Sequence, residues 1–173
     1  RAAARTPDAP ALTAGARTWA YAELDAALQA FASGLAGLGL ERTDRVGIWL
    51  DKRFETVVAS FGAPAAGGVM VPMNPLLKPE QVVYIARDCN VRVLVTSPER
   101  WVLLAAGLAT ADGACPDLRH VVLTGPVPAD APRPGGVALH GWDDLLAAPA
   151  RSGHRVIATD LVAILYTSGS TGR

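Results

Sequence analysis

Cysteine is scarce in this sequence, in which Cys89 and Cys115 are the only two among 173 residues. They lack the short spacing of paired zinc ligands, and two cysteines are too few for a disulfide-dense scaffold. The composition therefore excludes a small secreted domain that depends on disulfides. We predict free thiols and a cytoplasmic location.

An excess of charge of either sign is also absent. Lys and Arg together number 16, as do Asp and Glu, so the formal net charge is zero. This balance gives no electrostatic reason to expect binding to nucleic acid or to an anionic membrane. No run of eighteen apolar residues occurs, so we predict no transmembrane segment. Residues 1–8 lack the apolar core of a signal peptide.

Histidine is rare as well, and the sequence predicts no metal site. His120, His140 and His154 do not have the spacing of metal ligands, so we interpret them as structural or solvent-facing. Asp143 and Asp144 are adjacent in the sequence. Because adjacent side chains diverge on a helix, we assign the two carboxylates no joint acid–base role.

Half of the residues are hydrophobic, and their spacing predicts helices and strands in alternation. An amphipathic helix is indicated by apolar residues at steps of three and four, which are Leu24, Leu28, Phe31, Leu35 and Leu38. Strands are expected at 11–14, 45–50, 69–71, 92–96 and 119–124, and further helices near 54, 79, 98 and 142. This order is typical of an α/β domain with a largely parallel sheet flanked by helices, which binds ligands at the carboxyl ends of its strands. We expect residues 1–173 to form a single, partial domain of this kind.

The start of the first long helix lacks one half of a capping box. We expect this helix to open within residues 19–24, with Glu23 in its first turn. Ala20 stands where Ser or Thr would accept a backbone N–H bond, which weakens the helix start by about 1 kcal/mol. We therefore interpret Glu23 as an anion at the positive end of the helix and not as a catalytic residue.

The end of the sequence joins an apolar run to a cluster of small residues. The run, residues 161–166, follows Asp160 and predicts a strand that is buried on both faces. We call it the terminal run. Glycines in the cluster permit unusual backbone conformations, so several N–H groups can converge on one anion beside four hydroxyl groups. The predicted phosphate-binding residues are Thr167, Ser168, Gly169, Ser170, Thr171 and Gly172.

This Gly/Ser/Thr loop, residues 167–172, has two other interpretations. A flexible Ser/Gly linker has the same composition, but a buried strand leading directly into the loop argues against a linker. The Walker pattern needs four residues between its glycines and then Lys, whereas only two residues separate Gly169 from Gly172, and Arg173 follows. The loop is therefore not a Walker motif.

Residues 166–172, Tyr-Thr-Ser-Gly-Ser-Thr-Gly, resemble the phosphate loop of the adenylate-forming superfamily. That group comprises acyl-CoA synthetases, luciferases and the adenylation domains of peptide synthetases. Residues 66–75, Ala-Gly-Gly-Val-Met-Val-Pro-Met-Asn-Pro, resemble a second signature of the superfamily, to which we assign only a structural role. The resemblance extends from about Thr6 to Arg173 and implies the amino-terminal part of the large domain. Because the loop normally continues into Pro-Lys-Gly, we expect the sequence to be a fragment of a longer protein.

The resemblance implies an ATP-dependent carboxylic acid CoA ligase that acts through an acyl-adenylate. Residues 167–172 would then hold the β- and γ-phosphates of ATP together with Mg²⁺, and coenzyme A would be the co-substrate. A fatty acid is the expected small-molecule substrate. The superfamily's adenine, ribose and catalytic-lysine residues have no counterpart within residues 1–173, so we expect this fragment alone to be inactive.

Two other functions stay open on the sequence. One is an adenylation domain that loads an amino or aryl acid onto a carrier protein, because such domains share the same motifs. The other is a non-catalytic nucleotide-binding remnant. A Pro-Lys-Gly continuation and a distal lysine in the parent protein would distinguish an enzyme from a remnant. The sequence does not indicate an oligomeric state.

Overall fold

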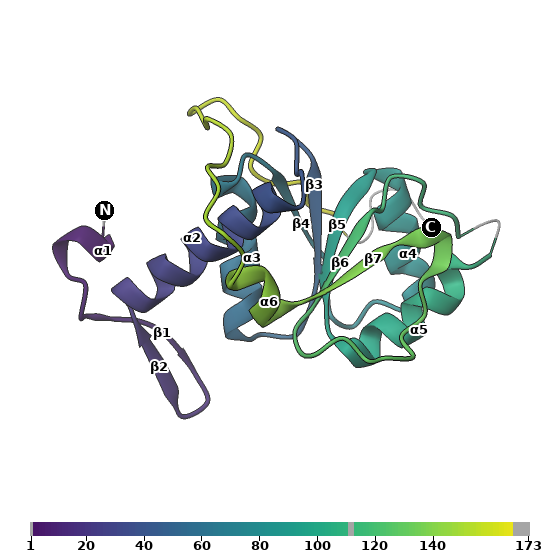
Figure 1. Ribbon diagram of the computed structural model, residues 1–173, viewed down its shortest axis with the longest axis horizontal. Helices are drawn as coiled ribbons and strands as arrows, with labels where there is room; N and C mark the ends of the chain where they lie inside the picture. The colour runs from purple at the N-terminus through teal and green to yellow at the C-terminus, as the bar shows by residue number, and fades with distance from the viewer. Residues whose placement is uncertain (1, 111–112, 168–173) are drawn as a thin grey trace.

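The computed structural model describes residues 2–110 and 113–167, and its centre is a five-stranded parallel sheet (Figure 1). The strand order is β4-β3-β5-β6-β7, with every neighbouring pair parallel. The strands are β3 (Arg45–Trp49), β4 (Val69–Pro72), β5 (Val91–Thr96), β6 (His120–Leu123) and β7 (Ala138–Gly141). The predicted α/β class with a parallel sheet flanked by helices is therefore confirmed.

Helices cover both faces of the sheet, and each face has its own apolar cluster. On one face Phe31, Val58 and Trp142 contribute to the core, and on the other Val82 and Trp101 do so. The first face is covered by α2 (Tyr21–Gly37), α3 (Phe54–Ala65) and α6 (Trp142–Leu146), and the second by α4 (Pro79–Asp88) and α5 (Pro98–Leu108). This sandwich explains why the central strands are apolar throughout, since both of their faces are removed from water.

The amino-terminal region stands apart from this sandwich. Helix α1 (Ala2–Arg5) leads into an antiparallel hairpin of β1 (Pro10–Ala14) and β2 (Arg17–Ala20), which projects from the body in Figure 1. Gly15 has a φ of +59° in the turn, where a residue with a side chain would be strained. Trp19 of β2 fixes the hairpin to the sandwich by stacking on Phe54, with ring centroids 4.4 Å apart.

Strand β2 was not predicted, and it leads directly into the first long helix. The helix begins at Tyr21, within the expected range 19–24, with Ala20 at its N-cap. Pairing of β2 with β1 keeps the backbone before the helix extended up to this cap. The remaining predicted strands and helices up to residue 146 are confirmed, apart from shifts of one or two residues at their ends.

The terminal run does not form the buried strand that its composition predicts. Only Ala163 pairs with the sheet, through an isolated parallel bridge to Met70. Leu161 and Leu165 are 57% and 67% exposed. The run lies at the outer edge of the sheet beside β4, and within it Ala163 and Ile164 are only partly buried. The apolar run therefore correctly predicted a segment associated with the sheet. The prediction that this segment is buried on both faces was wrong.

Candidate phosphate-binding site

The terminal run, which leads into the candidate site, is held by two backbone hydrogen bonds to β4. The N–H of Met70 donates to the carbonyl of Val162, and the N–H of Ile164 donates to the carbonyl of Met70, both at 3.0 Å. Met70 pairs with Val46, the second residue of β3. The terminal run therefore joins the sheet near the amino ends of the strands.

Tyr166, the last residue of the terminal run, makes a further contact with the body of the domain. Its hydroxyl donates to the carboxylate of Asp88, at the end of α4. Burial and the bond to Asp88 raise the pKa of Tyr166. Asp88 is followed by Cys89 and Asn90, whose carbonyls accept hydrogen bonds from Arg45 at the start of β3. The Tyr166 hydroxyl thus lies near the amino ends of the strands. Our expectation that the loop lies at the carboxyl ends of the strands stays a prediction, because residues 168–172 lie outside the described part of the chain.

The predicted phosphate-binding residues lie mostly outside the described part of the structure. Thr167 is described and is exposed directly after Tyr166. The other five predicted residues, Ser168, Gly169, Ser170, Thr171 and Gly172, lie beyond the last described residue. Their role in holding phosphate therefore stays a prediction.

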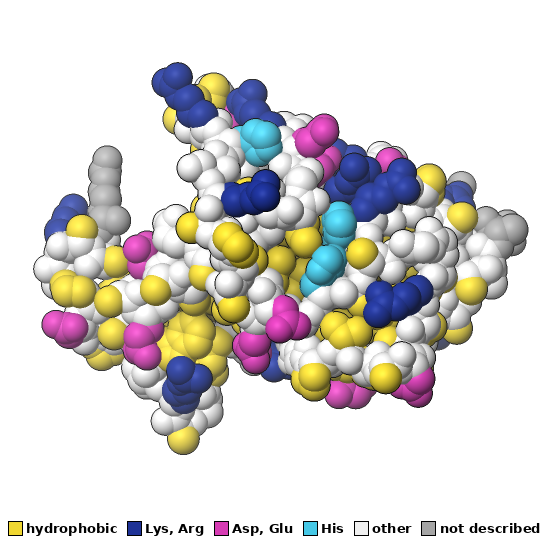
Figure 2. Space-filling view, in the orientation of Figure 1, with side chains coloured by type: hydrophobic (Ala, Val, Ile, Leu, Met, Phe, Trp, Pro, Cys, Tyr) yellow, Lys and Arg dark blue, Asp and Glu magenta, His cyan; other side chains and the backbone are white. Residues whose placement is uncertain are grey.

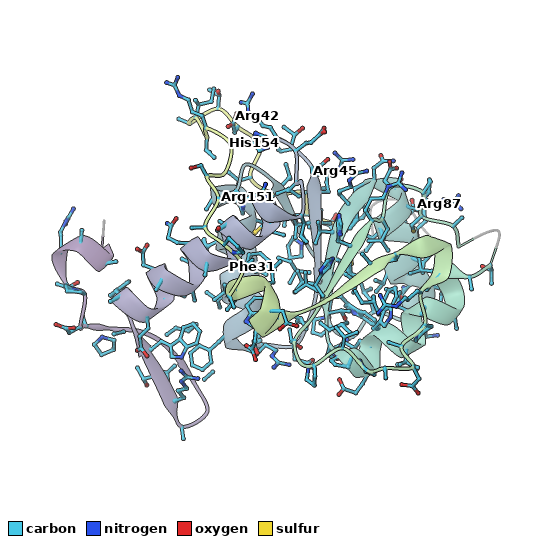
Figure 3. The ribbon with its side chains drawn as sticks, in the orientation of Figure 1. Phe31, Arg42, Arg45, Arg87, Arg151 and His154 are labelled. Atoms are coloured by element: carbon cyan, nitrogen blue, oxygen red, sulfur yellow. The ribbon has the colours of Figure 1, made fainter. Side chains whose placement is uncertain are left out.

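A well-anchored segment leads from α6 to the terminal run. The backbone N–H of Arg151 donates to the hydroxyl of Ser33 at 2.7 Å, and Nε2 of His154 lies 2.9 Å from the carbonyl oxygen of Leu40. Arg42 forms an ion pair with Asp160, which precedes the terminal run. Figure 3 labels Arg42, His154 and Arg151 on the same side of the molecule, above the end of α2. These contacts guide the chain from β7 back to the opposite edge of the sheet, beside β4.

The carboxyl edge of the sheet, where we expected a ligand, holds an ion pair and an aromatic contact. The guanidinium carbon of Arg100 lies 4.8 Å from the ring centroid of Trp49, and its Nη2 lies 2.9 Å from Asp51. Arg100 also donates to the carbonyl of Pro75 at 2.9 Å. Because these partners already satisfy Arg100, we interpret the cluster as a clamp between β3, α5 and the loop after β4.

The other residues considered from the sequence do not assemble into a catalytic or metal site. Among the described residues, no group of three or more His, Cys, Asp and Glu side chains could hold a metal ion. Cys89 and Cys115 are half-buried thiols, and burial raises the pKa of each. Asp143 and Asp144 are exposed in the first turn of α6, where a negative charge favours the helix.

The sequence did not predict that two of its histidines would meet. Nδ1 of His120 lies 3.1 Å from Nε2 of His140, on the neighbouring strands β6 and β7. The two positions are far apart in the sequence, and only the strand order brings them together. The available signal was that each histidine stands within a short, otherwise largely apolar strand.

Comparison with known proteins decides the family. The sequence model described as "AMP-binding enzyme" matches residues 1–173, which is the whole chain. The chain belongs to the AMP-binding enzyme family. This result confirms the predicted relationship to adenylate-forming ligases.

Individual AMP-binding relatives include both CoA ligases and peptide synthetases. The 3-[(3aS,4S,7aS)-7a-methyl-1,5-dioxo-octahydro-1H-inden-4-yl]propanoyl:CoA ligase of Mycobacterium tuberculosis is 35% identical, over 96% of this chain and 32% of the ligase. The nonribosomal peptide synthetase ecdA of Aspergillus rugulosus is 32% identical, over 98% of this chain and 2% of the synthetase. The solved anthranilate CoA ligase AuaEII, in complex with anthranoyl-AMP, superposes with a TM-score of 0.80 at 27% identity and covers 96% of this chain and 30% of that one. The chain therefore spans about a third of these two CoA ligases.

Proposed function

We propose that this AMP-binding chain is part of an ATP-dependent CoA ligase that forms an acyl-adenylate from a small carboxylic acid. In the first step a carboxylate oxygen attacks the α-phosphorus of ATP, and the bond to pyrophosphate breaks. In the second step the sulfur of coenzyme A attacks the acyl carbonyl, and AMP leaves with its oxygen. The products are AMP, pyrophosphate and a thioester.

The match of the family model over residues 1–173 is the observation that carries this proposal. The M. tuberculosis relative is a CoA ligase, and the anthranilate CoA ligase was solved with an acyl-adenylate. Both resemble the present chain over nearly its whole length, which supports the same reaction class.

Within this reaction we assign residues 167–172 to the β- and γ-phosphates of ATP. Amide N–H groups and hydroxyl groups would balance the charge that develops on pyrophosphate, and Mg²⁺ would accompany those phosphates. Their task is positioning and charge stabilisation, because none of these side chains is a proton-transfer group at neutral pH. We place the enzyme in the cytoplasm, on the cysteine usage argued above.

We rank the acid substrates in the order in which they should be tested, and we keep two acyl acceptors open. A fatty acid is the first substrate class to test, and an aryl acid is the second because the solved relative uses anthranilate. Peptide synthetases among the relatives keep open the alternative of an adenylation domain that loads a carrier protein. We further propose that residues 1–173 alone form no acyl-adenylate, since catalysis needs the adenine and acid pockets fixed together with the loop.

The test uses the purified full-length protein that contains this chain. It is incubated with Mg-ATP, coenzyme A and a panel of fatty, aryl and amino acids, and the nucleotide and thioester products are identified by mass spectrometry. We expect AMP and acyl-CoA in equal amounts with at least one acid. AMP formation with acyl transfer only to a carrier protein would favour the alternative. ADP formation, or no acid-dependent AMP, would contradict the proposal.

A further inference from the structure

The His120–His140 pair joins the outermost strand of the sheet to its neighbour. The two ring nitrogens lie 3.1 Å apart, and the ring centroids are 5.2 Å apart with the planes tilted by 47°. A separation of this size fits a nitrogen–nitrogen hydrogen bond, in which one ring donates a proton and the other accepts it. Figure 2 shows two adjacent histidine side chains at the surface, where solvent protons reach them.

The bond requires at least one of the two rings to be neutral. A neutral imidazole has one donor and one acceptor nitrogen, whereas a protonated imidazole has two donors. If both rings carry a proton on each nitrogen, Nδ1 of His120 and Nε2 of His140 present hydrogen atoms to each other. Double protonation therefore replaces an attraction by a repulsion at the contact between β6 and β7.

The surroundings of the pair disfavour additional positive charge. Burial lowers the pKa of His120, and the charges of His140, Arg92 and Arg119 lower it further. Burial also lowers the pKa of His140, with Arg133 acting in the same direction. The charged residues that surround the pair or line the cavity beside His140 are Arg92, Arg119, Arg133, Asp144 and Arg151. Four of these five groups are cationic, so the site as a whole opposes protonation.

Loss of this hydrogen bond would affect strand β7 more than any other element. It has four residues and pairs only with β6 among the described strands. It leads directly into α6, whose Trp142 stacks on Phe31 of α2 at 5.0 Å. A cavity of about 340 Å³ lies between these elements, and His140, Asp144 and Leu38 are part of its lining. Movement of β7 would therefore open this cavity.

We propose that His120 and His140 form a pH-sensitive latch, which holds β7 on β6 at neutral pH and releases it in mildly acidic solution. Both folded-state pKa values are lowered, so the unfolded chain binds protons first as the pH falls. The stabilisation is complete above the ordinary histidine pKa of about 6.5 and is lost progressively below it. The two rings titrate as a coupled pair and not as independent groups.

Hydrogen exchange of the full-length protein tests the latch. Protection factors of the β7 amides are compared at pH 7.5 and pH 5.5, after correction for the intrinsic effect of pH on exchange. We expect β7 protection to fall about tenfold at the lower pH, which corresponds to one unit of pKa difference, while β3 and β5 change little. His120→Gln/His140→Gln should remove this dependence, because glutamine side chains hydrogen-bond without titrating. His154→Gln, which alters a histidine bonded to Leu40 instead, should retain it.

A second readout keeps the proposal testable if the double variant does not fold. In the unmodified protein, labelled histidine carbons followed by NMR should show two coupled titration steps, with at least one midpoint clearly below 6.5. Independent titration of both rings near 6.5, or equal β7 protection at the two pH values, would overturn the latch. Persistent pH dependence in the folded double variant would do so as well.

Discussion

At the residue scale, Gly34 shows how closely α2 and α6 approach. A Cβ atom at this position would lie 2.6 Å from Cγ of Leu145 and 2.7 Å from its carbonyl oxygen. Such distances are shorter than any ordinary contact, and the carbonyl belongs to backbone that cannot rotate away. Glycine is therefore required here by the packing of two helices and not by its backbone angles.

Gly34→Ala should consequently destabilise the protein by about 1–3 kcal/mol, through overpacking of the contact with Leu145. Gly37→Ala is the matched control in the same helix, because nothing lies within 4 Å of its added methyl group. That variant should be neutral or more stable by roughly 0.5–1 kcal/mol, since alanine favours helix over glycine. Urea denaturation of both variants provides the comparison, and equal stabilities would contradict the packing argument.

At the element scale, the start of α2 confirms one sequence argument in detail. The carboxylate of Glu23 accepts the backbone N–H of Ala20 at 2.8 Å, which is one half of a capping box. Ala20 has the extended backbone of a helix cap, with φ −76° and ψ 165°, but it carries no side-chain acceptor for the other half. Glu23 is thus occupied in capping, as its position in the sequence indicated.

Ala20→Ser should complete this cap and raise the free energy of unfolding by about 1 kcal/mol. The serine hydroxyl would accept the backbone N–H of Glu23, since those of Tyr21 and Ala22 already donate to backbone carbonyls. Ala22→Ser is the control, because it adds the same hydroxyl two residues later, inside the helix, where serine has no capping role. A thermal melt in which both variants shift equally would show that Ala20 does not limit this helix.

How much the sequence could predict differs from element to element. Helices α4 and α5 were predictable, since each begins with proline at its first position and α5 is capped by Ser97. Strand β2 was missed because its four residues lie directly before a helix, and only pairing with β1 keeps them extended. The proximity of His120 and His140 also depends on strand order, which local patterns do not contain.

The terminal run shows what a local sequence pattern cannot predict near the candidate site. The six apolar residues predicted a strand that is buried on both faces. The segment does lie beside the sheet, but it is not buried on both faces. Burial is decided by neighbouring elements, and β4 is the strand that the run touches in the described part of the chain. The Gly/Ser/Thr loop was predicted from composition and order, because phosphate binding by backbone amides depends on local sequence, and its role stays a prediction.

At the scale of the whole molecule, two covered sheet faces coexist with an apolar edge that is exposed among the described residues. Large hydrophobic side chains of the terminal run, among them Leu161 and Leu165, are exposed. An unpaired sheet edge with apolar side chains is a template for association with another chain. We therefore expect residues 1–173, prepared alone, to self-associate.

Light scattering of this 173-residue chain over a range of concentrations measures that association. Leu161→Lys/Leu165→Lys should reduce it, because charges at a sheet edge oppose edge-to-edge pairing. Leu76→Lys is the control, since Leu76 is 88% exposed but lies in the loop after β4 and not in the terminal run. A monomer at all concentrations, or an equal reduction of self-association by the control variant, would show that the chain does not associate through the terminal run.

We propose that this AMP-binding chain supplies the phosphate loop of an acyl-adenylate-forming ligase. Acid-dependent exchange of labelled pyrophosphate into ATP measures that step most directly, in the full-length protein. We predict robust exchange in the unmodified enzyme and a loss of at least about a hundredfold in Gly169→Val/Gly172→Val, since side chains would fill the space of the anion and remove amide donors. Unchanged exchange in a correctly folded double variant would contradict the assignment of residues 167–172.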